Sequence, residues 1–407
     1  MAGFIRSDKV QVGVLLLTFM PFVAVVFFGF ESGNDAVVAT ATGLAIASAG
    51  FALAWGTESL QFVVSQVLAL AVLAIVQVMP EYSVEVVLAY RGATDATILH
   101  YATAAMTGAN RLLLGLGWPV VFVLSYFASK RAGVNRDALE LEGQQSMAIL
   151  FLGLATLYSF VIVARRSLGV EDAAVLLAVF AAYLYIAKKL PPHGEERLGE
   201  LEGPALAVAS LSGARKLLAT AFFVGVGGAV IVFGAEPFVG SFLAVASSLN
   251  VNQYLLIQWL TPVLTELPEA ITVFYWAAKT GKGAMALANL VSSKLNQWTV
   301  LLATIPVVYA IALGGFHGIA LTQLQVDELL LTASQSLFGF VCLVDLKLSW
   351  REAALLFALF AVQFAFPPVR FEVSVLYIVL SAVELFLNRS RMVVLATVSS
   401  LVKEHIH

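Results

Sequence analysis

Charged residues are scarce in this sequence. Of its 407 residues, 12% are Asp, Glu, Lys or Arg and 60% are hydrophobic, and the mean hydropathy is +0.92. A soluble domain carries about 25% charged residues, so a soluble multi-domain enzyme is excluded. The formal net charge of −3 indicates no nucleic-acid partner. A single cysteine, Cys342, excludes a disulfide scaffold.

The apolar residues gather in long runs, which predict a polytopic all-α membrane protein with the lipid bilayer as its partner. A membrane helix needs about 20 apolar residues. Charges, Gly and Pro divide the chain into twelve candidate spans. They are 10–30, 36–55, 59–90, 96–128, 145–163, 172–189, 216–234, 238–279, 283–314, 328–344, 350–366 and 372–388.

The placement of basic residues supports this count. If the spans alternate across the bilayer, seventeen of the 23 Lys and Arg residues fall on one side and four on the other. Arg111 and Lys294 remain inside spans. Basic residues collect on the cytoplasmic side, so we expect a protein of the cytoplasmic membrane with both termini in the cytoplasm.

The two halves of the chain resemble one another. Pro80-Glu81 and Pro268-Glu269 interrupt equivalent apolar segments, and 171–181 matches 351–361 at six of eleven positions. Gly56-Thr57-Glu58 likewise parallels Gly234-Ala235-Glu236. Five spans in each unit give the second unit the opposite orientation, an inverted repeat typical of secondary transporters.

This organisation predicts a core of two five-helix repeats with one extra helix at each end. The predicted parts are an N-terminal helix (1–35), the first repeat (36–189), a cytoplasmic linker (190–215), the second repeat (216–366), and a C-terminal helix with its tail (367–407).

Four glutamates lie within predicted spans: Glu81, Glu85, Glu266 and Glu269. The other acidic residues lie at span ends, where a solvated helix cap explains them. A carboxylate at membrane depth costs about 2.5–3.5 kcal/mol on insertion scales unless it is paired or neutralised. Duplication of Pro-Glu in the two halves favours a shared cation site over structural ion pairing.

Proline strengthens this prediction. Pro80 and Pro268 have no N–H for the carbonyl one turn earlier, so each is expected to disrupt its helix and free an oxygen atom. Carboxylate and carbonyl oxygens suit hard cations such as Ca²⁺ and Na⁺. Gln77 and Thr265, each four residues before a glutamate, could add further oxygen ligands.

Two motifs resemble those of the sodium/calcium exchanger superfamily of cation antiporters. The first is Thr265-Glu266-Leu267-Pro268-Glu269 followed by Ala288-Asn289-Leu290-Val291-Ser292-Ser293-Lys294. The second is Gln77-Val78-Met79-Pro80-Glu81 followed by Thr107-Gly108-Ala109-Asn110. The five-plus-five arrangement over 36–366 also resembles that fold.

The resemblance implies exchange of a cation, usually Ca²⁺, against Na⁺ or H⁺ by alternating access, without a cofactor. The central acidic ligands of the family, and therefore the metal ligands, correspond to Glu81 and Glu269. The other ion-binding residues implied are Thr265, Ser293, Asn110 and, replacing a hydroxyl, Gln77; Asn296 or Gln297 would supply a later polar ligand.

Two bases depart from the family pattern. Lys294 stands where the motif often has Asn, and Arg111 directly follows Asn110. Our hypothesis is that each replaces a bound cation and pairs with one of the extra carboxylates, Glu85 or Glu266. Those two glutamates are alternatively proton carriers. The simpler interpretation is that both bases form structural ion pairs, or that their long side chains extend to the membrane–water interface.

Other functions stay open at this point. The chain could be a Na⁺/H⁺ exchanger, an anion transporter that uses Arg111 and Lys294, or a non-transporting sensor or scaffold with the same fold. The sequence contains no zinc-protease helix motif, no nucleophile elbow and no phosphate-binding loop, so we expect neither an enzyme nor an ATP-driven pump.

Overall fold

The computed structural model describes residues 8–29, 33–60, 62, 78–134, 137–190, 203–387 and 393–405, and these are predominantly helical. The all-α prediction is therefore confirmed. The chain divides into two compact units, the first formed by Met1–Leu88 and Pro192–Glu269 and the second by Ala89–Pro191 and Ala270–His407. Each unit draws on both halves of the sequence, so neither corresponds to one of the predicted repeats.

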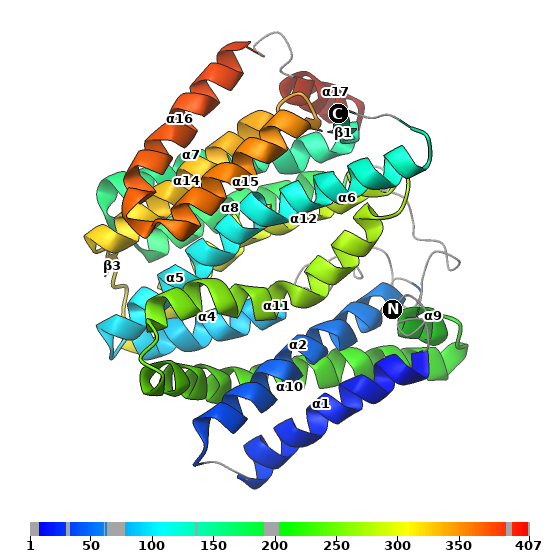
Figure 1. The fold of residues 1–407 in the computed structure, drawn as a ribbon, viewed down its shortest axis with the longest axis vertical. Coiled ribbons are helices and arrows are strands. Elements are labelled where there is room, and N and C mark those ends of the chain that lie inside the picture. The colour runs from blue at the N-terminus through cyan, green and yellow to red at the C-terminus, as the bar shows by residue number, and fades with distance from the viewer. Residues whose placement is uncertain are drawn as a thin grey trace. The chain divides into compact units, whose positions relative to one another are not determined.

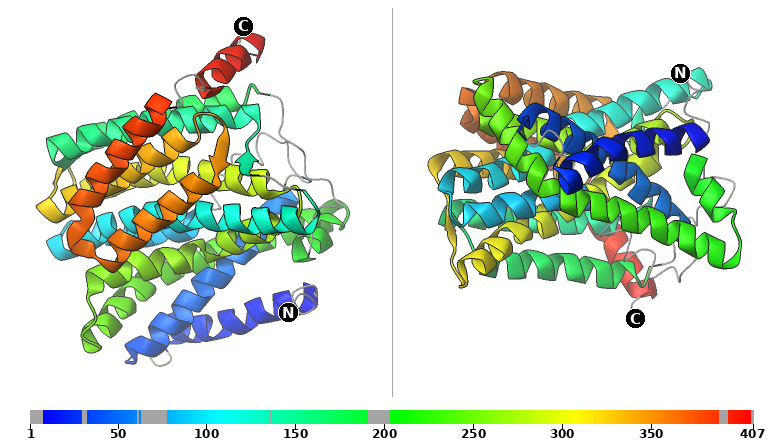
Figure 2. Two further views of the ribbon diagram at one scale, coloured as in Figure 1. Left: turned by 45° about the horizontal axis from the view of Figure 1, so that its top comes forward. Right: turned by 90° about the horizontal axis from the view of Figure 1, so that it is seen from below.

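Helices α2 and α10 form the centre of the first unit, side by side in Figure 1. Small residues allow their close approach. A Cβ atom at Gly227 would lie 2.9 Å from Leu53 Cγ, and one at Gly56 would lie 2.7 Å from Val224 Cγ2. Helix α1 packs against both (Figures 1 and 2). The unit contains α1 (Asp8–Phe28), α2 (Asp35–Leu60), α9 (Gly203–Ala209), α10 (Gly213–Ser248), most of α4 (Met79–Gly92) and α11 (Gln253–Ala277) up to Glu269.

The first unit corrects two predicted boundaries. Helix α10 continues through Gly234-Ala235-Glu236 and Pro237, where one span was expected to end and the next to begin. Helix α2 likewise continues through Gly56-Thr57-Glu58. Proline removes one backbone hydrogen bond, but membrane helices accept it where neighbouring groups satisfy the freed carbonyl. The residue motifs were therefore poor guides to helix ends.

The second unit is larger. Its helices are α5 (Ala96–Leu112), α6 (Trp118–Arg131), α7 (Ser146–Arg165), α8 (Val170–Ala187), α12 (Gly283–Asn296), α13 (Leu302–Leu313), α14 (Gln323–Cys342), α15 (Trp350–Ala365), α16 (Arg370–Leu387) and α17 (Val393–His405). Helix α14 packs against α16, α7 and α5. Short 3₁₀ turns lie at Gly143–Gln145 and Pro367–Val369.

Two π-helical turns interrupt long helices at comparable places. The turn η1 (Leu113–Gly117) joins α5 to α6, and η4 (Gln297–Leu301) joins α12 to α13. A π-turn contains an extra residue within a helical turn, and such turns are frequent at functional sites. Each half of the chain thus contributes one long helical rod with a π-turn inside it.

The short strands show a comparable pairing. Strand β1 (Ala138–Glu140) follows α6 and pairs antiparallel with β4 (Lys347–Ser349), which follows α14. Strand β2 (Ser167–Leu168) follows α7 and pairs with β3 (Ile319–Ala320), which follows α13. Exchanging the two halves of the chain converts one strand pair into the other.

Two helix starts match in the same way. The Asp172 carboxylate accepts a 2.8 Å hydrogen bond from the Gly169 N–H at the start of α8. The Glu352 carboxylate accepts one of 2.7 Å from the Ser349 N–H at the start of α15. Both carboxylates lie in the segments that the sequence comparison aligned.

Among the described residues, seven helical segments are long and apolar enough to cross a membrane. They are Val10–Phe28, Asp35–Leu60, Ala96–Arg131, Gly143–Arg165, Val170–Ala187, Gly213–Ser248 and Gly283–Leu313. Helices α14 to α16 fall outside this group, and the count of twelve spans stays a prediction.

Candidate cation site

The first predicted carboxylates begin helix α4. Pro80 occupies the first turn, where its missing N–H costs no helical hydrogen bond, and Glu81 follows it. A carboxylate there is stabilised by the positive end of the helix dipole. Glu85 lies one turn later on the same face, and the two residues are only 7% and 1% exposed. Gln77 lies outside the described residues.

The second Pro-Glu pair lies inside helix α11, which is continuous from Gln253 to Ala277. The predicted disruption at Pro268 is thus the loss of a hydrogen bond without an interruption of the helix. Thr265 is buried and its hydroxyl donates to the Thr261 carbonyl at 3.1 Å. Glu266 and Glu269 are half-buried.

Both Pro-Glu segments pack against the central helix pair of the first unit. A Cβ atom at Gly50 of α2 would lie 2.5 Å from Pro268 Cγ, so glycine is required there for Pro268 to sit this close. A Cβ atom at Gly228 of α10 would lie 3.6 Å from Met79 Cε, next to Pro80. The close approach at Gly50 fixes where Pro268 lies within this unit, whereas the contact of Met79 with Gly228 is an ordinary van der Waals contact.

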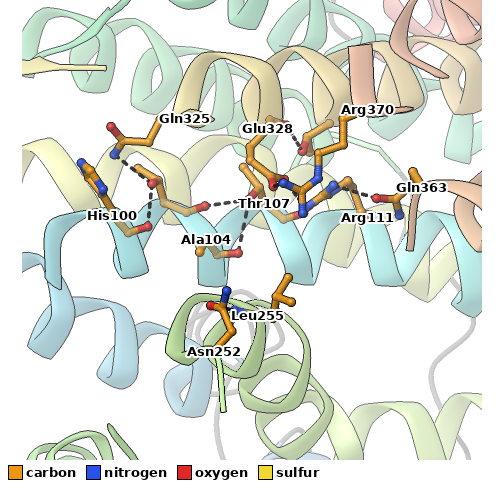
Figure 3. A network of polar contacts seen from close by, with 12 residues as sticks. His100, Ala104, Thr107, Arg111, Asn252, Leu255, Gln325, Glu328, Gln363 and Arg370 are labelled. Atoms are coloured by element: carbon orange, nitrogen blue, oxygen red, sulfur yellow. Dashed lines mark hydrogen bonds and ion pairs between the residues drawn. The ribbon is translucent and has the colours of Figure 1, made fainter. Parts of the chain in front are cut away.

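Arg111 of α5 is fully buried in the second unit and pairs with the buried carboxylate of Glu328 on α14 (Figure 3). Its Nη1 donates to Gln363 Oε1 at 2.9 Å, and its Nε donates to the Thr107 carbonyl at 3.2 Å. Arg370 Nη1 lies 2.7 Å from Glu328 Oε1. The guanidinium of Arg111 is thus held from α5, α14 and α15.

This network adds a carboxylate that the sequence interpretation did not name. Arg111 pairs with Glu328, and its predicted pairing with Glu85 or Glu266 stays a prediction. Glu328 was taken as a solvated residue at the start of its span, but α14 begins five residues earlier, at Gln323. A buried arginine needs a carboxylate partner, and this requirement could have pointed to Glu328 from the sequence.

Lys294 of α12 is fully buried and lies against Asn110 of α5. Its Nζ donates to Asn110 Oδ1 at 2.6 Å and lies 3.4 Å from the Asn110 backbone oxygen. The amide of Asn110 is oriented by its own Nδ2, which donates to the Met106 carbonyl at 2.9 Å. Nζ also lies 4.5 Å from the centroid of the Trp298 ring, a cation–π distance.

Three further predicted ligands lie near this lysine in the sequence. Ser293 is half-buried on α12, while Asn296 and Gln297 are buried where α12 meets η4. The second unit therefore brings together Asn110 and Lys294 from the predicted set, and joins Arg111 to residues that were not in it.

Comparisons with known proteins identify the family. A sequence profile described as sodium/calcium exchanger protein matches residues 34–189 and 219–367. The chain belongs to the sodium/calcium exchanger family. Members of this family are membrane-embedded cation antiporters, so the predicted multi-pass membrane protein and its resemblance to this family are confirmed.

Solved structures agree with this assignment. The exchanger superposes on the crystal structure of the H⁺/Ca²⁺ exchanger CAX with a TM-score of 0.90 and 33% identity, covering 97% of this chain and 98% of that one. It superposes on the sodium-calcium exchanger NCX_Mj with a TM-score of 0.52 and 18% identity, covering 80% and 95%, which shows a shared fold alone. A search of curated proteins gives no match.

Among its described residues, the exchanger has no group of three or more His, Cys, Asp or Glu side chains placed to hold a metal ion. The predicted metal ligands, Glu81 and Glu269, supply two carboxylates, so a bound Ca²⁺ would need hydroxyl, amide or carbonyl oxygens as well. Thr265, in the same unit as both glutamates, carries a hydroxyl oxygen.

Proposed function

We propose that this exchanger moves Ca²⁺ across the cytoplasmic membrane in exchange for H⁺. The observation that carries the proposal is the 33% identity to an H⁺/Ca²⁺ exchanger over 97% of the chain. Similarity at this level extends well beyond a shared fold. Exchange against Na⁺ is the alternative coupling, and the same experiment distinguishes the two.

Glu81 and Glu269 are the proposed central ligands of the transported ion. Thr265, Ser293, Asn110 and Gln77 would add neutral oxygens, and Glu85 and Glu266 are the candidate proton carriers. Ca²⁺ and the counter-ion then compete for the same carboxylates near the membrane midplane. Exchange follows because the protein reorients only when the carboxylates are compensated by one ion type or the other.

The proposed topology has twelve spans, with two inverted five-helix repeats and both termini in the cytoplasm. The equivalent π-turns η1 and η4 and the two exchanged strand pairs support the duplication. Basic residues concentrated on one side of the predicted topology support the orientation. We propose no cofactor, no nucleic-acid partner and no enzymatic activity, because ion gradients supply the driving force.

Transport in liposomes tests the proposal. Purified protein is reconstituted, and ⁴⁵Ca²⁺ uptake is measured with an outward H⁺ gradient, an outward Na⁺ gradient, or neither. Uptake that depends on the H⁺ gradient is the expected result, and uptake driven by Na⁺ alone would assign the alternative coupling. The absence of gradient-driven flux of any cation would contradict antiport and favour a non-transporting sensor or scaffold.

An anion transporter is less well supported. The guanidinium of Arg111 is committed to Glu328 and Gln363, and the ammonium of Lys294 donates to Asn110. Donors that already have acceptors are poorly suited to binding a transported anion. Flux of ³⁶Cl⁻ or ³²P-phosphate in the same liposomes checks this candidate.

A further inference from the structure

Asn110 and Lys294 occupy equivalent positions in the two long helical rods. Asn110 lies three residues before η1, which begins at Leu113, and Lys294 lies three residues before η4, which begins at Gln297. A π-turn shifts every side chain that follows it, so its position gives a structural register. Lys294 therefore stands where the other rod carries Asn110.

The surroundings of the Lys294 ammonium resemble the coordination of a cation. Nζ contacts an amide oxygen at 2.6 Å, a backbone oxygen at 3.4 Å and an aromatic face at 4.5 Å. The Asn110 oxygen faces the ammonium because its nitrogen is bound by the Met106 carbonyl. Oxygens of these two kinds are the neutral ligands that proteins offer to hard cations.

We propose that the ammonium of Lys294 is a tethered cation that occupies the place of an inorganic monovalent ion on the Asn110 oxygens. The ammonium is compact and singly charged, as such an ion is, whereas a guanidinium is planar and extended. This inference rests on the proposed cation exchange and assigns a specificity role to Lys294. The ammonium fills one cation position permanently, so the protein binds one counter-ion fewer in each transport cycle.

Three substitutions at lysine test the proposal, with Na⁺ as the probe. Lys294→Asn leaves room and an additional oxygen, Lys294→Met fills the same space without charge, and Lys188→Met makes the matched change at an exposed lysine. Binding of ²²Na⁺ to purified full-length protein is counted in equivalents per chain. We expect Lys294→Asn to bind one Na⁺ more than the wild type, and Lys294→Met and Lys188→Met to bind no more than the wild type.

Thermal unfolding is a second measurement, and it also detects a variant that is less stable than the wild type. An ion that binds only the folded state stabilises it by mass action. Lys294→Asn should therefore unfold at a lower temperature in choline chloride and regain stability in NaCl, while Lys294→Met should not respond. An Asn variant with the wild-type number of Na⁺ ions and no stabilisation by Na⁺ would overturn the proposal.

These outcomes are separate from the test of transport. If the wild type carries no Ca²⁺ but Lys294→Asn gains a Na⁺ ion, the tethered cation stands and the proposed function fails. If the wild type exchanges Ca²⁺ and Lys294→Asn gains no ion, the proposed function stands and Lys294 is a structural residue.

Discussion

The rods Ala96–Arg131 and Gly283–Leu313 each contain a π-turn and a buried basic residue close to it. The two basic residues make different contacts. Arg111 pairs with a buried carboxylate and donates to an amide side chain. Lys294 donates to the amide oxygen of the opposite rod and lies over a tryptophan ring. A buried base beside a π-turn can therefore hold a helix in place, as Arg111 does, or supply a positive charge to an ion site, as we propose for Lys294.

The chemistry of the two side chains explains the division. A guanidinium presents five donors in a rigid plane, which suits an Arg–Glu–Arg arrangement in which one carboxylate joins three helices. An ammonium has three rotatable donors on a flexible stem and is strongly hydrated, so its burial in place of a metal ion is chemically closer to ion binding. The network around Arg111 should accordingly matter most for stability, and the contacts of Lys294 for ion binding.

Removal of the carboxylate at the centre of the Arg111 network should have the largest effect on folding. Glu328→Gln leaves Arg111 and Arg370 close together without the carboxylate that they share, and breaking a buried ion pair costs about 3–5 kcal/mol. We expect a marked loss of thermal stability in detergent. Glu328→Asp keeps the charge and should lose less, and a Glu328→Gln protein as stable as the wild type would show that the network is dispensable.

The π-turn η1 should tolerate no added side chain at Gly115. A Cβ atom there would lie 2.3 Å from Cγ of Phe360 on α15, so Gly115→Ala must displace the ring. Overpacking of this kind costs about 1–3 kcal/mol. Gly225→Ala in α10 is the matched control, because a Cβ there meets nothing within 4 Å. Equal unfolding temperatures for the two variants would contradict the close packing of η1.

The contact between Lys294 and Trp298 should be measurable as a coupling energy. A double-mutant cycle with Lys294→Met and Trp298→Leu isolates the pair from the loss of each side chain alone. A cation–π contact contributes about 0.5–2 kcal/mol, more where water is excluded. Additive effects on the free energy of unfolding would mean that the ring packs beside the ammonium without attracting it.

An exposed ion pair gives the reference for both buried bases. Lys347 Nζ lies 2.5 Å from Glu140 Oε1 where β4 pairs with β1, and both side chains are about half exposed or more. Exposed pairs contribute from nothing to about 1 kcal/mol because water screens them. Glu140→Gln should therefore shift the unfolding temperature least, and a loss comparable to that of Glu328→Gln would contradict the distinction between buried and exposed charges.

Hydrophobic runs were sufficient to predict an all-α membrane protein, because bilayer thickness constrains sequence strongly. The exchanger family was predicted from two motifs that resemble it. Helix ends were predicted less well. Proline and Gly-x-Glu clusters inside α2 and α10 resemble boundaries in sequence, but packing with neighbouring helices keeps the chain helical through them.

The partner of Arg111 could not be predicted from local sequence. Glu328 is more than two hundred residues away and lies one turn inside α14, so its burial depends on where that helix begins. The π-turns could not be predicted from the sequence either, because Leu113–Gly117 and Gln297–Leu301 share no sequence motif. Such features arise from tertiary packing, which periodicity does not encode.

The most direct test of the account is Ca²⁺ flux through a protein that lacks its two central carboxylates. Glu81→Gln combined with Glu269→Gln should reduce H⁺-driven ⁴⁵Ca²⁺ uptake to that of empty liposomes, because neutral amides cannot compensate a divalent ion. Glu140→Gln, reconstituted in parallel, should transport as the wild type does. Full uptake by the double variant would contradict the assignment of Glu81 and Glu269 as the ligands of the transported ion.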